Sequence, residues 1–223
     1  MTIWAIIPVK ALHEGKSRLA DLLTVAERVR LTSDILGHML GVLNDLPQIA
    51  RTLVVSRDPA ALKLARRQGV QTFAESGGSN LNDALTRAAH IAAANQARAV
   101  LVLPADLPFL RAADVAAMLA PATEMIGARS DVVTRRMIAI CPDRAEDGSN
   151  ALLVAPPVGF QFQYGPGSFR RHQTEAHRLG MEVHVVDARG IRFDLDTEAD
   201  WRRYVAAPPF AFERHPEPDH GAP

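Results

Sequence analysis

Residues 3–9 read Ile-Trp-Ala-Ile-Ile-Pro-Val, a short apolar run with β-branched side chains that is typical of a strand buried on both faces of a sheet. A second such run, Ala99 to Leu103, leads directly into Pro-Ala-Asp-Leu-Pro. Between these runs, apolar stretches at 52–56 and 70–74 alternate with helical patterns of three- and four-residue spacing. The alternation predicts an α/β fold with a mostly parallel central sheet and helices on both faces.

Local signals indicate where the helices begin. Thr24 to Glu27 has the spacing of a capping box, and Asp58-Pro59 places an N-cap residue before a proline at the first helical position. Residues 121–136 are weakly patterned and receive no assignment. Further helices are predicted at about 81–96, 112–119, 168–179 and 197–204, and further strands at 137–141, 151–154, 181–186 and 191–193.

Length and composition fit one globular domain. The chain has 223 residues, of which 48% are hydrophobic and 22% are charged, close to the averages for soluble domains. We expect a single domain over residues 1–205. Residues 206–223 are rich in proline and show little periodicity, so we expect an extended or disordered tail there.

The charge balance and the single cysteine exclude several classes of protein. Lysine plus arginine and aspartate plus glutamate each number 25, so nothing favours binding to nucleic acid. No apolar stretch is long enough for a membrane span, and the N-terminus does not resemble a signal peptide. Cys141 is alone, which excludes a disulfide within the chain and suits the cytoplasm. We therefore expect a cytoplasmic protein with no nucleic-acid or membrane partner.

A cationic loop follows the first predicted strand. Residues 10–18 read Lys-Ala-Leu-His-Glu-Gly-Lys-Ser-Arg, and a loop in this position lies at the edge of a parallel sheet where ligands bind. Lys10, Lys16 and Arg18 could hold a triphosphate and neutralise a departing pyrophosphate. The glycine spacing of a P-loop is absent. The alternative is an ordinary solvated loop.

Aspartates follow two predicted strands. Asp106 lies between two prolines directly after the strand that ends at Leu103, and Asp194 and Asp196 follow the strand predicted at 191–193. Because alternate residues of a strand point the same way, Asp194 and Asp196 should share a face and repel unless a cation offsets them. Carboxylates suit Mg²⁺. The alternative is that these aspartates form turns or cap helices.

Two glycine-bearing turns could bind an anion. Asp147 to Asn150 precedes a predicted strand, and backbone amides with Ser149 could face an anionic ligand there, although turn residues alone explain the run. Gly165 to Ser168 opens a predicted helix, where free amides and the helix dipole favour phosphate or carboxylate. The alternative for Ser168 is a plain N-cap.

Taken in order, these motifs resemble the guanylyltransferase family of coenzyme F(420) biosynthesis, which acts on 2-phospho-L-lactate or, in bacteria, phosphoenolpyruvate. The similarity covers about residues 2–205. The motifs are IIPVK…KSRL at 6–19, NLNDAL at 80–85, LPADLP at 103–108, DGSNALL at 147–153, YGPGSFRRH at 164–172 and FDLDTEADW at 193–201.

The resemblance implies a glycosyltransferase-A-like nucleotidyltransferase fold. It also implies that GTP and a 2-phospho acid give a guanosine diphosphate-linked acid and pyrophosphate. By position, Lys10 and Lys16 match the phosphate-contacting loop, and the 80–82 segment lies where related enzymes approach the nucleotide. The Gly148-Ser149 segment and Ser168 match the loops that hold the acid acceptor. Residues and resemblance together predict catalytic or substrate-binding roles for Lys10, Lys16, Arg18, Asn80, Asn82, Asp106, Gly148, Ser149, Gly165 and Ser168, and Mg²⁺ ligands at Asp106, Asp194 and Asp196.

Some features depart from the family pattern or stay open. The family usually has Gly-Thr-Asn where this chain has Gly148-Ser149-Asn150, and the 121–136 stretch looks longer than usual. Alternatives are a molybdopterin guanylyltransferase-like or sugar-1-phosphate nucleotidyltransferase, and a non-catalytic nucleotide-binding protein of the same fold. The acceptor could be phosphoenolpyruvate, 2-phospholactate or 3-phosphoglycerate. A homodimer is compatible with the sequence but not indicated by it.

Overall fold

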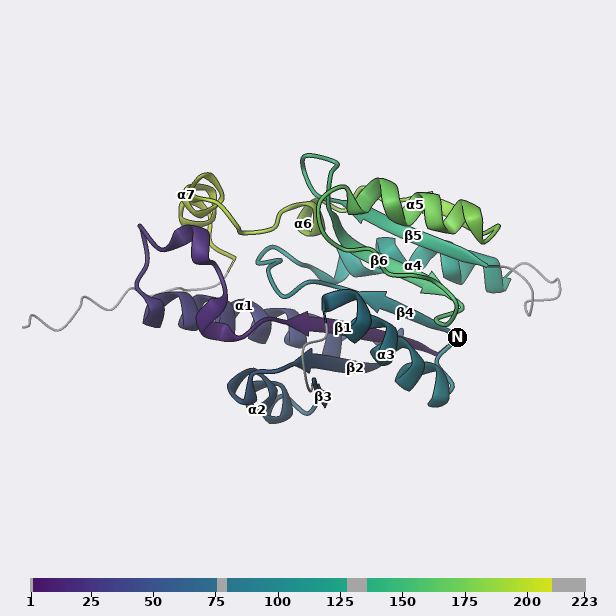
Figure 1. The fold of residues 1–223 in the computed structure, drawn as a ribbon, viewed down its shortest axis with the longest axis horizontal. Helices are drawn as coiled ribbons and strands as arrows, with labels where there is room; N and C mark the ends of the chain where they lie inside the picture. Colours follow the sequence, from purple (N-terminus) through teal and green to yellow (C-terminus); the bar gives the residue numbers. More distant parts are fainter. Residues whose placement is uncertain (1, 76–79, 128–135, 210–223) are drawn as a thin grey trace, which may run out of the picture.

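The computed structural model describes residues 2–75, 80–127 and 136–209, in which a seven-stranded sheet forms the centre of the fold (Figure 1). The strand order across the sheet is β3-β2-β1-β4-β6-β5-β7. The strands are β1 (Ile3–Val9), β2 (Ile49–Ser56), β3 (Gln71–Ala74), β4 (Ala99–Val102), β5 (Met137–Pro142), β6 (Ser149–Ala155) and β7 (Glu182–Val185).

Most neighbouring strands run parallel. β1 pairs in parallel with β2 and β4, β2 with β3, and β5 with β7. β6 runs antiparallel to both of its neighbours, β4 and β5. The predicted α/β fold with a mostly parallel sheet is therefore confirmed.

Helices cover both faces of the sheet, as predicted. One core contains Ile3, Ala5 and Ile7 of β1 with residues of α1, α2, α4 and α7, and the other contains Trp4 and Ile6 with residues of α3 and α5. The alternation along β1 explains why it is apolar throughout. The longer helices are α1 (Val25–Asn44), α2 (Pro59–Arg67), α3 (Leu81–Ala94), α4 (Ala112–Gly127), α5 (Ser168–Arg178) and α7 (Glu198–Ala206), and the short ones are η1 (Leu12–Glu14), η2 (Ser17–Leu19) and α6 (Arg189–Arg192).

The strand predicted at 191–193 is wrong, because these residues belong to α6 and to the segment that follows it. The reason is a contact between parts of the chain that are distant in sequence. Gly190 lies so close to α4 that its N–H donates to Asp114 Oδ1 at 3.2 Å, instead of to the carbonyl of a neighbouring strand. Helix α4 also runs through Pro121 to Gly127, beyond the predicted end at 119. The rest of the unassigned stretch, 128–135, and residues 210–223 of the predicted tail lie outside the described residues.

Substituting Gly190 tests whether this close contact supports the fold. A Cβ atom at Gly190 would overlap the Phe109 carbonyl oxygen and the Asp114 carboxylate. Overpacking of this kind lowers the free energy of unfolding by about 1–3 kcal/mol, which urea titration of Gly190→Ala should show. Gly41→Ala in α1 is the matched control, because nothing lies within 4 Å of that position and alanine favours a helix. A Gly190→Ala protein as stable as the wild type would contradict the prediction.

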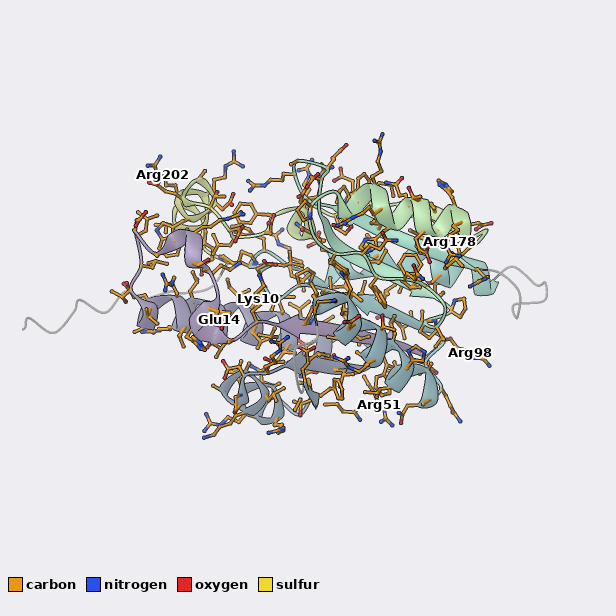
Figure 2. All side chains as sticks on the ribbon, viewed as in Figure 1. Lys10, Glu14, Arg51, Arg98, Arg178 and Arg202 are labelled. Carbon is orange, nitrogen blue, oxygen red and sulfur yellow. The ribbon has the colours of Figure 1, made fainter. Side chains whose placement is uncertain are left out.

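The sheet has one edge at which the loops of interest gather. The parallel strands β1, β2 and β4 all end there, and Figure 2 shows Lys10 and Glu14 toward this end while Arg51 and Arg98 lie at the opposite end. Within the described residues, no helix combines the length and apolar character needed to cross a membrane.

Candidate functional site

A cavity of about 820 Å³ opens at the carboxyl edge of β1, β2 and β4. This volume lies in the range of pockets that hold cofactor-sized ligands. The predicted residues that line it are Lys10, Lys16, Arg18, Asn80, Asp106 and Asp196. The other predicted residues lie outside the cavity lining: Asn82, Gly148, Ser149, Gly165, Ser168 and Asp194.

The loop after β1 forms one wall of the cavity through η1 and η2. The Leu12 N–H donates to Asp58 Oδ2 at 2.7 Å, which ties the loop to the start of α2. Lys16 adopts a left-handed conformation with φ of 55°, which is strained for a residue with a side chain. Such strain persists only where the surrounding structure holds the backbone in place. The Lys16 side chain points into the fold and is only 6% exposed.

Two of the three predicted cations are held in ion pairs. Lys16 Nζ lies 3.3 Å from Asp106 Oδ2, and Arg18 Nη1 lies 2.6 Å from Asp196 Oδ2. Lys10 is exposed at the cavity wall. The loop is therefore more than a solvated surface, because two of its cations pair with aspartates that lie 90 and 178 positions away in the chain.

Asp194 lies beside Asp106. The Leu195 N–H donates to the Asp106 carbonyl oxygen at 3.0 Å, so the two segments run next to each other. Burial raises the pKa of Asp194 above its usual value, and the Asp106 charge raises it further, while a hydrogen bond from Asn150 lowers it. Two hard carboxylates that repel each other suit Mg²⁺, which is commonly held by one or two carboxylates and substrate phosphates. Asp106 and Asp194 therefore fit such an ion.

Asp196 differs from the expectation that it shares a face with Asp194. The segment after α6 is not a strand, and Asp196 faces Arg18 while Asp194 faces Asp106 and Asn150. In the described part of the chain, no three or more carboxylate, histidine or cysteine side chains are arranged to hold a metal ion. The metal role of Asp196 stays a prediction. It does not cap α7 either, because Thr197 is the N-cap.

The two glycine-bearing turns meet in the second half of the molecule. The Ser149 N–H donates to Ser168 Oγ at 3.0 Å, and both side chains are buried. Gly148 directly precedes Ser149, and Gly165 lies three residues before Ser168. The cluster formed by Gly148, Ser149, Gly165 and Ser168, called here the serine cluster, lies outside the cavity lining.

Three backbone N–H groups at the start of α5, which were expected to be free, already have acceptors; anion binding at this helix start stays a prediction. The N–H groups of Gly167, Ser168 and Phe169 donate to Asp147 Oδ2, the Gly165 carbonyl and the Asp147 carbonyl, each at 3.0 Å. Gly167, in a left-handed conformation, is the N-cap, so Ser168 is not a plain cap. Its buried hydroxyl instead accepts the Ser149 amide hydrogen.

Asn80 and Asn82 hold the start of α3. Asn80 is the N-cap and accepts the Asp83 N–H at 3.0 Å, and it lines the cavity. Asn82 bonds the backbone of Tyr164 twice, with Asn82 Oδ1 accepting the Tyr164 N–H at 2.7 Å and Asn82 Nδ2 donating to the Tyr164 carbonyl at 3.3 Å. Asn82 therefore fixes the loop that carries Tyr164 to the cavity wall.

Three side chains beside the site had no predicted role. Asn150 is buried and donates to the Ile191 carbonyl at 2.9 Å and to Asp194 Oδ1 at 3.3 Å. His172 is fully buried against the Tyr164 ring, whose centroid lies 4.8 Å away. The Tyr164 hydroxyl is buried without a hydrogen-bond partner among the described residues. One sequence feature could have pointed to His172: it lies four residues after Ser168 and thus on the same face of α5.

The fold is shared with nucleotidyltransferases of known structure. Among solved structures, the chain is similar to a CMP:2-keto-3-deoxy-manno-octonic acid synthetase complexed with CTP, with a TM-score of 0.60 at 13% identity over 92% of this chain and 98% of that one. It is also similar to 4-diphosphocytidyl-2C-methyl-D-erythritol synthase from Anaerococcus prevotii, with a TM-score of 0.59 at 10% identity over 92% and 97%. These similarities concern the fold.

The chain belongs to the guanylyl transferase CofC-like family, whose model matches residues 3–205. It is 40% identical to phosphoenolpyruvate guanylyltransferase of Rubrobacter xylanophilus over 93% of this chain and 95% of that protein. It is 32% identical to 2-phospho-L-lactate guanylyltransferase of Methanothermobacter thermautotrophicus over 90% and 82%. The family predicted from the sequence motifs is therefore confirmed.

Proposed function

We propose that this protein is a guanylyltransferase that transfers GMP from GTP to a small 2-phospho acid, phosphoenolpyruvate or 2-phospho-L-lactate, in coenzyme F(420) biosynthesis. The observation that carries the proposal is the arrangement along the sheet edge. The cavity, lined by the cationic loop and Asp106, lies on the β1–β2–β4 side. The buried serine cluster lies on the β6–α5 side, where Asn150 of β6 donates to Asp194, the neighbour of Asp106.

In the proposed reaction, a phosphate oxygen of the acid attacks the α-phosphorus of GTP in line. A new phosphorus–oxygen bond forms as the bond to the β-phosphate oxygen breaks, and pyrophosphate leaves. Lys10, Lys16 and Arg18 bind the phosphates and stabilise the charge on the leaving group. Asp106 and Asp194 would hold Mg²⁺, which when bound supplies charge stabilisation at the phosphates. The chain otherwise acts by positioning, since this chemistry needs no protein nucleophile.

The acceptor is proposed to bind at the serine cluster, through Gly148, Ser149, Gly165 and Ser168. Two observations support this location. Both serines are buried, and the backbone N–H of Ser149 donates to Ser168 Oγ; Asn150, the residue after Ser149 in β6, donates to Asp194. A cytoplasmic location and a homodimer are further parts of this proposal; the lone buried Cys141 is compatible with the first.

Pyrophosphate release tests the proposal directly. We expect release with GTP and a phospho acid, and much slower release with ATP, CTP or UTP under matched conditions. Phosphoenolpyruvate, 2-phospholactate and 3-phosphoglycerate should be offered in competition and the products identified by mass spectrometry, because a methyl-sized difference is worth only about 1–3 kcal/mol in a pocket. Preference for another base, or no product with any acid, would reject the proposal.

A further inference from the structure

The imidazole of His172 connects three separate segments of the chain. It stands in the second turn of α5, fully buried, with the Phe160 ring centroid 5.8 Å and the Tyr164 ring centroid 4.8 Å away. Its Nε2 accepts the backbone N–H of Gln163 at 2.9 Å, and its Nδ1 lies 2.9 Å from Ser149 Oγ. Both ring nitrogens are therefore engaged in directed hydrogen bonds.

The Gln163 amide determines which ring nitrogen carries the proton. A backbone N–H can only donate, so Nε2 must present a lone pair. An imidazole with neither nitrogen protonated would be an anion, so Nδ1 carries the hydrogen and donates it to Ser149 Oγ. The ring is neutral in this arrangement, in keeping with burial and the Arg171 charge, which lower the pKa of His172 to about 4.

This tautomer fixes the role of the Ser149 hydroxyl. Because Ser149 Oγ accepts from His172, its own hydrogen must point to another group. Ser168 Oγ likewise accepts, from the Ser149 N–H, and keeps its hydrogen. No hydrogen bond donated by either hydroxyl is found among the described residues, although Ser149 and Ser168 are only 4% and 2% exposed. Buried donors without acceptors are uncommon and indicate a missing partner.

We propose that His172 is a positioning residue, which by donating to Ser149 holds that hydroxyl as a hydrogen-bond donor for the carboxylate or phosphate of the phospho acid. The inference rests on the proposed function, since that function places the acceptor at the serine cluster. His172 itself touches no substrate. The same geometry excludes Ser149 as a nucleophile activated by His172, because Nδ1 already carries a proton and cannot take another.

Two conservative variants separate the two bonds of the ring. The amide of His172→Asn can still donate at the Nδ1 position toward Ser149, whereas the longer His172→Gln can still accept from Gln163 at the Nε2 position but loses the donor to Ser149. Loss of one hydrogen bond to a charged group corresponds to about tenfold or more in affinity. We expect His172→Gln to raise KM for phosphoenolpyruvate by about tenfold with KM for GTP unchanged, and His172→Asn to stay near the wild type.

A double variant distinguishes positioning from a general loss of structure. In the Ser149→Ala background, His172→Gln should add little to the rise in KM, because both changes remove the same donor. Thermal melting checks that each variant is folded, and ¹⁵N NMR of the full chain at pH 7 should show the Nδ1-protonated tautomer of His172.

The outcomes separate the inference from the proposed function. An active wild type whose folded His172→Gln variant keeps a normal KM for phosphoenolpyruvate would overturn the inference alone. A proton on Nε2, or equal increases in both KM values, would also overturn it. A wild type that is inactive with every phospho acid overturns the proposed function and, with it, this inference.

Discussion

An Asp194→Asn variant is expected to lose at least about 100-fold in turnover while its free energy of unfolding stays the same or rises. Turnover falls because the carboxylate next to Asp106 would no longer be available to organise the phosphates. Stability does not fall, because burial and the Asp106 charge disfavour the ionised form of Asp194, as its raised pKa indicates. The neutral amide can keep the hydrogen bond from Asn150. Pyrophosphate release and urea unfolding at pH 7 without divalent cations measure the two effects.

Asp106→Asn is the matched control. It should lose turnover to a similar extent, but its stability should fall, because Lys16 is 6% exposed and would lose the carboxylate 3.3 Å away. Both variants should therefore lose turnover, but only Asp106→Asn should lower the free energy of unfolding. Near-normal turnover of Asp194→Asn at limiting magnesium would mean that these carboxylates only shape turns, and the proposed mechanism would be wrong.

The first half of the fold could be predicted from the sequence because its signals are local. An apolar run at 3–9 and the caps at Thr24 and Asp58 need no distant partner to be recognised, and the structure has strand and helices there. The prediction of a strand at 191–193 failed because Ile-Arg-Phe has the alternation of apolar and polar residues that is typical of a strand. The close approach of Gly190 to α4, 76 residues away, is what makes this segment turn instead.

In the candidate site, too, local sequence patterns allowed predictions, whereas contacts between distant residues did not. Lys16 and Asp106 could be placed together because loops after parallel strands meet at one edge, and their ion pair agrees with that expectation. The sequence did not show that N–H groups at the start of α5 are already bonded, because one acceptor, Asp147, lies 20 residues away from Gly167. Asn150 and His172 were missed because their contacts join residues 44 and 23 positions apart, and no spacing rule reports such pairs.

Lys16→Met is expected to reduce both turnover and stability. The methionine keeps the apolar stem but removes the charge that faces Asp106, so turnover should fall by about 100-fold in the pyrophosphate assay. The loss of a partner to a charged group lowers the free energy of unfolding by about 1–3 kcal/mol. The Asp106 side chain is 31% exposed, so water limits the loss of stability, which stays below that of a fully buried pair.

Lys10→Met, at an exposed residue of the same cavity wall, should raise KM for GTP without loss of stability.

The effect of Lys16→Met on stability should depend on Asp194. With Lys16 intact, one cation faces Asp106 while Asp106 and Asp194 repel each other. Removing the cation leaves that repulsion without compensation, whereas in an Asp194→Asn background there is less repulsion left to expose. The destabilisation by Lys16→Met should therefore be smaller in that background, and the difference is the coupling free energy of a double-mutant cycle in urea. Strictly additive losses would show that Lys16 supports only Asp106, and that Asp194 does not belong to the same electrostatic cluster.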